Sequence, residues 1–147
     1  MRLNVTKNYS VEIPAGVQVF GGDYAGDCLP EDADLISLVS WVKYNYPELA
    51  KVMYHIPNES MMPVQGRVTA RKKGVLSGAP DLCFALVPAV YIELKRRCVK
   101  KSLSSIKARQ HFEQQLAVLS SLQQAGNKCA VCFGLDNAKK SVLSLAL

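Results

Sequence analysis

The chain has 147 residues, 49% of them hydrophobic and 20% charged, which is ordinary for a globular domain with its own core. Its apolar runs fall short of the ~20 residues of a membrane span, and its first residues lack the apolar centre of a signal peptide. These features disfavour the membrane and secreted classes and leave a cytoplasmic protein as the default expectation.

Positive charge exceeds negative charge and is concentrated in two clusters. Eighteen Lys and Arg against twelve Asp and Glu give a net charge of +6, which favours a polyanionic partner. One cluster contains Arg67, Arg71, Lys72 and Lys73, and the other contains Arg96, Arg97, Lys100, Lys101, Lys107 and Arg109. Such clusters suit contacts with nucleic-acid phosphates. Two solvated faces of an ordinary domain are the alternative.

Residues 1–29 are expected to form short β segments and turns, an N-terminal extension ahead of a main domain over residues 30–147. A helix is expected to begin near Pro30, because proline suits the first helical position, and to end at Pro47. The elements expected next are a strand at 52–56, a helix at 64–73, strands near 81–87 and 90–97, a helix at 104–125 and a strand at 129–133. Asp136 is expected to cap a final short helix.

Cys129 and Cys132 have the spacing of a metal-binding pair. No second pair completes a zinc site, and the two thiols stand in an apolar, strand-like run. On a strand a separation of three residues points side chains to opposite faces. Both cysteines are therefore expected to be buried as small hydrophobic side chains.

Three charged residues stand in two short apolar runs in the middle of the chain. Asp81 leads the first run, 82–87, and Glu93 and Lys95 lie two residues apart in the next. Because side chains alternate between the faces of a strand, Tyr91, Glu93 and Lys95 share one face. The motif holds two acids and a base together, which suits metal-dependent hydrolysis of a phosphodiester bond.

That reaction needs an activated water and a cation that takes up developing negative charge, and Mg²⁺ supplies both through oxygen ligands. Asp81 and Glu93 are the candidate metal ligands, and Lys95 is the candidate for orienting water and stabilising the phosphate. The backbone carbonyl of Leu94 can be a further ligand. Glu31 falls on the apolar stripe of the first helix and can complete the shell.

Other interpretations stay open for these residues. The simplest is a surface hairpin with a cross-strand ion pair, worth about 0.2–1 kcal/mol. Glu59 is the reserve metal ligand should Glu31 fail. His55 can touch phosphate, although a structural histidine bonded to the backbone is the commoner role. Tyr91 can reach the site through its hydroxyl or simply pack.

The sequence resembles the VRR-NUC domain of the PD-(D/E)XK nuclease superfamily, especially its small stand-alone versions in phages and prophages. The resemblance runs from about Glu31 to Gly134. The segments that carry it are 55–59, 67–74, 78–82, 91–96 and 119–134. It implies a single α/β domain with a restriction-endonuclease-like αβββαβ core, in which helices flank a mixed central sheet.

The resemblance also implies roles for the site residues. Asp81 and Glu93 would bind a catalytic Mg²⁺ or Mn²⁺, Lys95 would serve the water and the phosphate, and Glu31 would be the first-helix acid. The family often carries a glutamine on the helix after the lysine strand. The glutamine that fits best is Gln115, and its competitors are Gln110 and Gln114.

The expected function is a structure-selective, metal-dependent DNA endonuclease. Stand-alone members of the family are similar to junction resolvases, so branched DNA such as a Holliday junction is the expected substrate and DNA repair the expected setting. The expected DNA contacts are Arg67, Arg71, Lys72, Lys73, Arg96 and Arg97. A homodimer would supply two active sites for opposed strands. The alternatives are a non-catalytic nucleic-acid-binding module of the same fold and a small adaptor that binds acidic partners.

Overall fold

The computed structural model describes residues 1–57 and 62–147. In chain order its elements are β1 (Arg2–Thr6), β2 (Tyr9–Glu12), β3 (Gln18–Phe20), α1 (Glu31–Asn45), α2 (Pro47–Ala50), β4 (Met53–His55), α3 (Val64–Lys72), β5 (Leu82–Phe84), β6 (Val90–Lys95), α4 (Val99–Ser102), α5 (Ile106–Gln124), β7 (Lys128–Phe133) and α6 (Leu135–Leu145). The predicted order of helix, three strands, helix and strand is confirmed, with short helices inserted between these elements.

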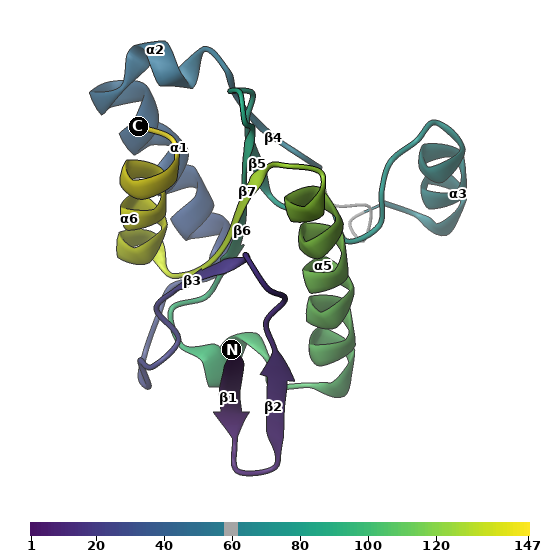
Figure 1. The fold of residues 1–147 in the computed structure, drawn as a ribbon. Helices are drawn as coiled ribbons and strands as arrows, with labels where there is room; N and C mark the ends of the chain where they lie inside the picture. The colour runs from purple at the N-terminus through teal and green to yellow at the C-terminus, as the bar shows by residue number, and fades with distance from the viewer. Residues whose placement is uncertain (58–61) are drawn as a thin grey trace.

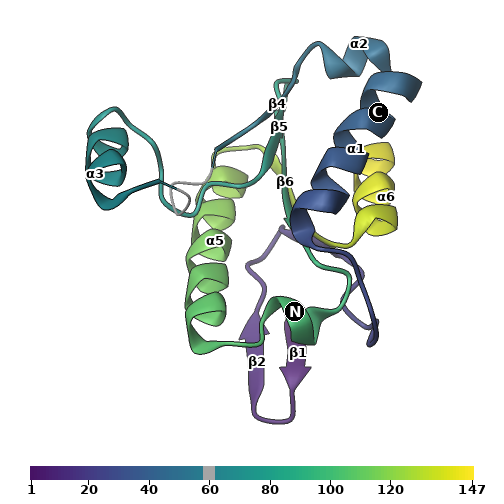
Figure 2. The same ribbon diagram turned by 180° about the vertical axis from the view of Figure 1, so that it is seen from behind.

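A five-stranded mixed sheet forms the centre of the molecule, in the order β3-β7-β6-β5-β4. Neighbours among β4, β5 and β6 are antiparallel, whereas β6, β7 and β3 run parallel. Parallel neighbours need a crossover connection, and α5 provides it between β6 and β7. The helices α1 and α6 cover one face of the sheet and α5 covers the other (Figures 1 and 2). The predicted α/β fold class is therefore confirmed.

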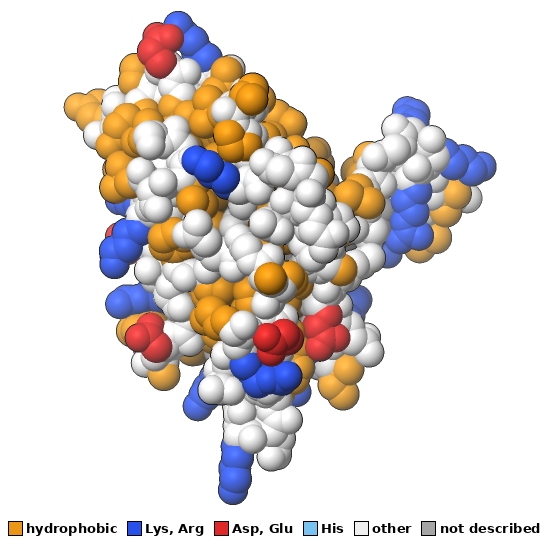
Figure 3. All heavy atoms as spheres, in the orientation of Figure 1, with side chains coloured by type: hydrophobic (Ala, Val, Ile, Leu, Met, Phe, Trp, Pro, Cys, Tyr) orange, Lys and Arg blue, Asp and Glu red, His pale blue; other side chains and the backbone are white. Residues whose placement is uncertain are grey.

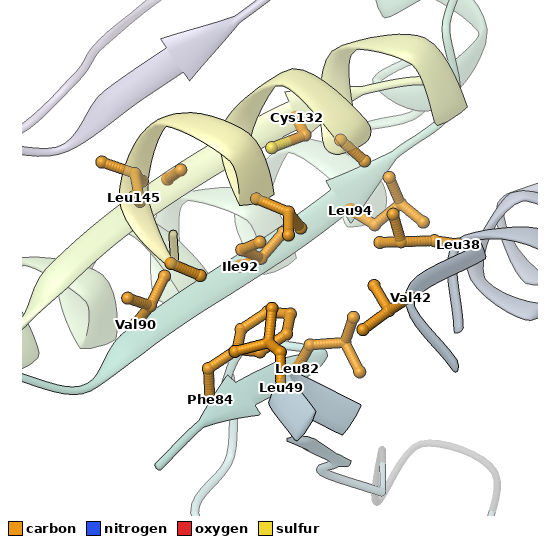
Figure 4. Packing of buried hydrophobic residues seen from close by; sticks show 14 residues of the cluster. Leu38, Val42, Leu49, Leu82, Phe84, Val90, Ile92, Leu94, Cys132 and Leu145 are labelled. Atoms are coloured by element: carbon orange, nitrogen blue, oxygen red, sulfur yellow. The ribbon is translucent and has the colours of Figure 1, made fainter. Parts of the chain in front are cut away.

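Aliphatic side chains fill the layer between the sheet and the helix pair α1–α6. Val90, Ile92 and Leu94 of β6 are completely buried there, and Leu38 and Val42 of α1 meet them (Figure 4). Their i, i+4 spacing puts Leu38 and Val42 on one face of the helix. Burial of each such side chain stabilises the fold by about 1.5–3 kcal/mol. This layer holds β6, the strand that carries Glu93 and Lys95, in a fixed position.

The opposite face of the sheet packs against α5. Phe112 and Leu119 of α5 are completely buried in this second layer, and Tyr91 of β6 packs against it. Tyr91 thus faces away from the α1–α6 layer, as the alternation along β6 predicts. Cys129 is buried in this layer and Cys132 in the other, so the prediction that they are small core side chains on opposite faces is confirmed.

The segment 1–29 contains a β1–β2 hairpin and strand β3, as expected for short β segments and turns. Strand β3 pairs in parallel with β7 at the edge of the central sheet, where Val19 lies opposite Val131. Leu3 and Val11 of the hairpin are buried in the same layer as α5. The segment thus contributes to the sheet and to the core, while the boundary at residue 30 stays a prediction.

The predicted helix near residues 64–73 is present as α3, and it stands apart from the rest of the molecule (Figures 1 and 2).

Two details differ from the prediction. Strand β5 is only three residues long, so Asp81 lies just before it and not on it. The cap prediction for Asp136 is wrong, because Gly134 takes the N-cap of α6 and Asp136 lies in its first turn. Among the described residues, no helix is long and apolar enough to cross a membrane.

Candidate active site

Three carboxylates from separate elements meet beside β6. Glu31 is the first residue of α1, Asp81 directly precedes β5, and Glu93 lies in β6. The antiparallel register pairs Leu82 with Ile92, so Asp81 and Glu93 are neighbours across the two strands. One carboxylate oxygen from each of the three acids lies within 4.8 Å of the other two. The sheet and the start of α1 therefore bring together the acids that the sequence separates by 50 and 12 positions.

Hydrogen bonds to both its backbone and its side chain fix Asp81. Its Oδ2 accepts the backbone N–H of Leu94 at 2.7 Å. Its carbonyl oxygen accepts the N–H of Ile56 and the Nδ1–H of His55, each at 2.8 Å. His55 therefore has the structural, backbone-bonded role among its two predicted alternatives. In an antiparallel pair of strands, the N–H and the C=O of one residue point to the same side. The N–H of Leu94 points to Asp81, so the carbonyl of Leu94 faces that side as well.

The side chain of Glu93 extends from β6 toward α5 and is completely buried. Its Oε1 accepts a hydrogen bond from Gln115 Nε2 at 2.8 Å and lies 3.8 Å from Lys95 Nζ. Lys95 is 7% exposed, and its ammonium also lies 5.4 Å from the centre of the Phe112 ring. No described residue hydrogen-bonds to Glu93 Oε2 or to Gln115 Oε1, although both atoms are buried. Buried oxygens without a partner cost free energy unless a cation or donor meets them.

The pKa of two of the acids is raised. Burial, and then the neighbouring Asp81, raises the pKa of Glu93 well above its usual range, and Lys95 opposes this only in part. Burial also raises the pKa of Glu31 to about 7, against the opposing effect of Lys95 and with a further contribution from Asp81. Like charges held this close disfavour full ionisation, and a divalent cation among the oxygens would remove that penalty.

The donor set fits a hard cation. Carboxylates and a backbone carbonyl are the oxygen ligands that Mg²⁺ and Mn²⁺ accept. Glu31, Asp81 and Glu93 supply the carboxylates, and the carbonyl of Leu94 faces the same side. The partnerless oxygen of Glu93 is a further observation in favour of such an ion.

Comparison with known proteins bears on the fold. No family model matches the chain, and no curated protein matches it. A solved structure of a VRR_NUC domain protein superposes on it with a TM-score of 0.62 at 20% sequence identity, over 82% of this chain and 89% of that chain. The chain has a VRR-NUC-like fold. At this identity the likeness shows the fold alone, so the chemistry of the site rests on its own residues.

A cavity of about 190 Å³ opens beside the acids of this VRR-NUC-like fold. Glu31, Asp81, Lys95 and Gln115 line it, and His111 of α5 lines it with them. His111 is a site residue that was not predicted from the sequence. It stands four residues before Gln115, which places both on one face of α5, and that spacing was the available signal.

The structure distinguishes the three candidate glutamines. Gln115 is buried and bonded to Glu93. Gln114 instead donates to Ser77 Oγ at 3.0 Å, and Gln110 is exposed. Glu59, the reserve ligand, lies outside the described residues. Gln115 is thus the one that touches the acids.

The predicted DNA contacts lie outside the acidic group. Arg96 donates to the carbonyl of Cys28 at 3.2 Å, and the guanidinium of Arg97 lies 3.7 Å from the centre of the Tyr24 ring. Both arginines therefore hold the segment that precedes α1. The remaining predicted contacts, on or just after α3, are Arg67, Arg71, Lys72 and Lys73. Basic side chains cover much of α3 (Figure 3).

Proposed function

We propose that the protein is a metal-dependent, structure-selective DNA endonuclease that hydrolyses phosphodiester bonds in branched DNA such as Holliday junctions. The observation that carries the proposal is the group of three carboxylate oxygens within 4.8 Å of one another, with Lys95 Nζ 3.8 Å from Glu93. A buried lysine beside clustered acids suits phosphoryl chemistry, because it adds a fixed positive charge where negative charge develops.

Glu31, Asp81, Glu93 and the carbonyl of Leu94 would hold Mg²⁺ or Mn²⁺. When bound, the ion supplies a water of lowered pKa and a Lewis acid for the phosphate oxygens. The chain's own residues then have separate tasks. Lys95 orients the attacking water and stabilises charge on the phosphate.

Gln115 and His111 act from the α5 side of the cavity. Gln115 fixes the orientation of Glu93 through its hydrogen bond of 2.8 Å, which is the role of an outer-shell partner. His111 lines the same cavity, so its imidazole can donate a hydrogen bond to a phosphate oxygen of the substrate. Neither residue needs to exchange a proton for these tasks.

The helix α3 supports the assignment of DNA as substrate. Arg71, Lys72 and Lys73 are exposed on or next to a helix that stands apart from the body, where they can follow a phosphate backbone without reading its sequence. Arg67 uses its Nε to hold the carbonyl of Met62 at 2.8 Å, so it also shapes the start of α3. A homodimer with C₂ symmetry would place two such sites on opposed strands. For a phage-encoded chain, the compartment that we propose is the cytoplasm of the bacterial host.

Cleavage assays test this proposal. A fixed Holliday junction, a flap and a linear duplex are incubated with protein and Mg²⁺, Mn²⁺ or EDTA, and the cut sites are mapped. We expect metal-dependent cuts near the branch, and we expect Lys95→Ala to slow them by about 10²–10³-fold. Lys43→Ala, an exposed lysine in the last turn of α1, is the matched control. Binding of all three DNAs without any cutting would leave only the non-catalytic module.

A further inference from the structure

An apolar groove lies directly beside the catalytic cavity. The helix α5 packs against β6 and β7. Over β4 and β5, the neighbouring part of the same face forms a groove of about 390 Å³ among the residues that the structure describes. Its walls include Tyr54 of β4, Tyr91 of β6 and Leu122 of α5. The volume is in the range of small-molecule sites, which is ~300–1,000 Å³.

Two tyrosines form the floor of the groove. Tyr54 lies opposite Cys83, and Cys83 lies opposite Tyr91, so the three side chains share one face of the sheet. The pairing of β4, β5 and β6 fixes the backbone beneath both rings, and Tyr54 remains 53% exposed. An aromatic ring with an open surface is a platform for stacking another flat ring.

The groove and the catalytic cavity share walls. Ile56, Pro57, Leu76 and Ala79 line both of them. Anything bound in the groove therefore lies next to whatever is bound beside Asp81. The shared wall at Leu76 and Ala79 belongs to the segment between α3 and β5.

A close approach to α5 keeps that segment in place. Gly78 has a φ of +80°, and a Cβ there would lie 3.1–3.4 Å from Gln114 atoms, two of them backbone. Gln114 also holds Ser77 through a hydrogen bond of 3.0 Å. The wall common to the cavity and the groove is therefore fixed on both sides, by α5 and by β5.

We propose that this groove binds one unpaired nucleobase of the DNA strand, adjacent to the phosphate that occupies the catalytic cavity; this inference rests on the proposed function. Two features indicate what occupies the groove: its shared wall with the catalytic cavity and the positive charge of α3. The cavity beside the metal ligands takes a phosphate, the basic residues of α3 suit the same backbone, and a nucleotide places its base next to its phosphate. The apolar, tyrosine-floored groove matches the flat face of a base, whichever base it is.

The proposal gives a physical reason for selecting branched DNA. A base must leave its stack to enter the groove, which costs free energy in an intact duplex and least where the strand is already unpaired. Flaps and junctions offer such nucleotides at the branch. The groove would then select for structure and not for sequence.

The test uses binding, so that it does not depend on turnover. Flap DNA that carries one abasic site, moved stepwise along the strand, is titrated by fluorescence anisotropy against Asp81→Asn protein, which leaves the DNA uncut. We expect the abasic site to weaken binding about tenfold at one position near the branch, the magnitude of one base–aromatic stack. Adding Tyr54→Ala should weaken binding of intact flap by a similar factor and make the abasic site at that position without further effect.

Matched variants isolate the contribution of the groove to binding. Tyr54→Phe keeps the ring and should bind as before. Tyr44→Ala, a tyrosine 87% exposed on α1, should also leave binding unchanged. The proposal is overturned if no abasic position matters or if Tyr54→Ala binds intact flap normally. It is also overturned if Tyr54→Ala changes the mass measured by sedimentation, because the groove is then an interface between copies of the chain. Cleavage by the protein with Asp81 intact is measured separately, and its absence contradicts the proposed function but not the base-binding groove.

Discussion

Replacing Glu31 by glutamine should stabilise the metal-free protein at alkaline pH. Glu31 starts α1, and its carboxylate lies within 4.8 Å of those of Asp81 and Glu93. Burial raises its pKa to about 7 from an ordinary value of 4.5. Glutamine keeps the shape of the side chain and removes the charge that the folded protein disfavours.

The magnitude follows from the two pKa values. A carboxyl with a higher pKa in the folded chain stabilises the fold fully below its unfolded value, and that contribution is lost as the pH rises through the folded value. The relevant window is therefore from 4.5 to about 7. At roughly 1.4 kcal/mol for each pH unit, Glu31 costs the wild type about 3 kcal/mol at pH 8 relative to pH 4. Glu93 changes stability in the same direction.

Urea unfolding in EDTA measures this effect, because urea does not screen charges as a salt does. We expect Glu31→Gln to exceed the wild type in free energy of unfolding by about 3 kcal/mol at pH 8 and to match it near pH 4. Asp32→Asn, an exposed acid one residue away, is the control and should change little. Addition of Mg²⁺ should reverse the order by stabilising the wild type more. A variant that is no more stable than the wild type at pH 8 would refute the reasoning.

Three further outcomes are expected. Gln115→Ala should lower metal affinity by about 10–100-fold while the protein stays folded, as loss of an outer-shell partner does. Titration with Mn²⁺, followed by electron paramagnetic resonance, measures this affinity. An unchanged affinity would contradict the role given to the hydrogen bond between Gln115 and Glu93. Burial raises the pKa of Cys129 to about 11 and of Cys132 to about 12, so mass spectrometry after iodoacetamide at pH 8 should find both unmodified until urea unfolds the chain. Arg71→Ala should weaken binding to junction, flap and duplex alike and reduce the salt slope by about 1; a loss confined to one DNA would contradict a backbone contact.

Much of the central site could be predicted because strand alternation is local. The pattern around Glu93 and Lys95 places both on one face of β6, and in the structure this is the face that α5 covers. The family resemblance implied a glutamine on the following helix, and Gln115 is the one bonded to Glu93. The inference about Glu93 and Lys95 needs only the period of a strand.

Other features depend on contacts that no local pattern records. Strand β3 is three residues long and gains its partner, β7, from more than a hundred positions away. The sequence places Arg96 in a basic cluster, yet its guanidinium donates a hydrogen bond to the carbonyl of Cys28, 68 positions earlier. His111 lies at the site only because α5 packs beside the cavity. Long-range pairings of this kind are set by packing of the whole chain, and propensity does not encode them.

The rate of junction cleavage in Asp81→Asn tests the central claim most directly. The substitution keeps an oxygen for the Leu94 N–H but removes the charge that would bind the metal. In single-turnover assays with Mg²⁺ on a fixed Holliday junction, we expect wild type and Asp32→Asn to cut at equal rates and Asp81→Asn to be slower by at least about a thousandfold. Equal cutting by wild type and Asp81→Asn, or no cutting by any of the three with Mg²⁺ or Mn²⁺, would contradict a nuclease centre built on these carboxylates.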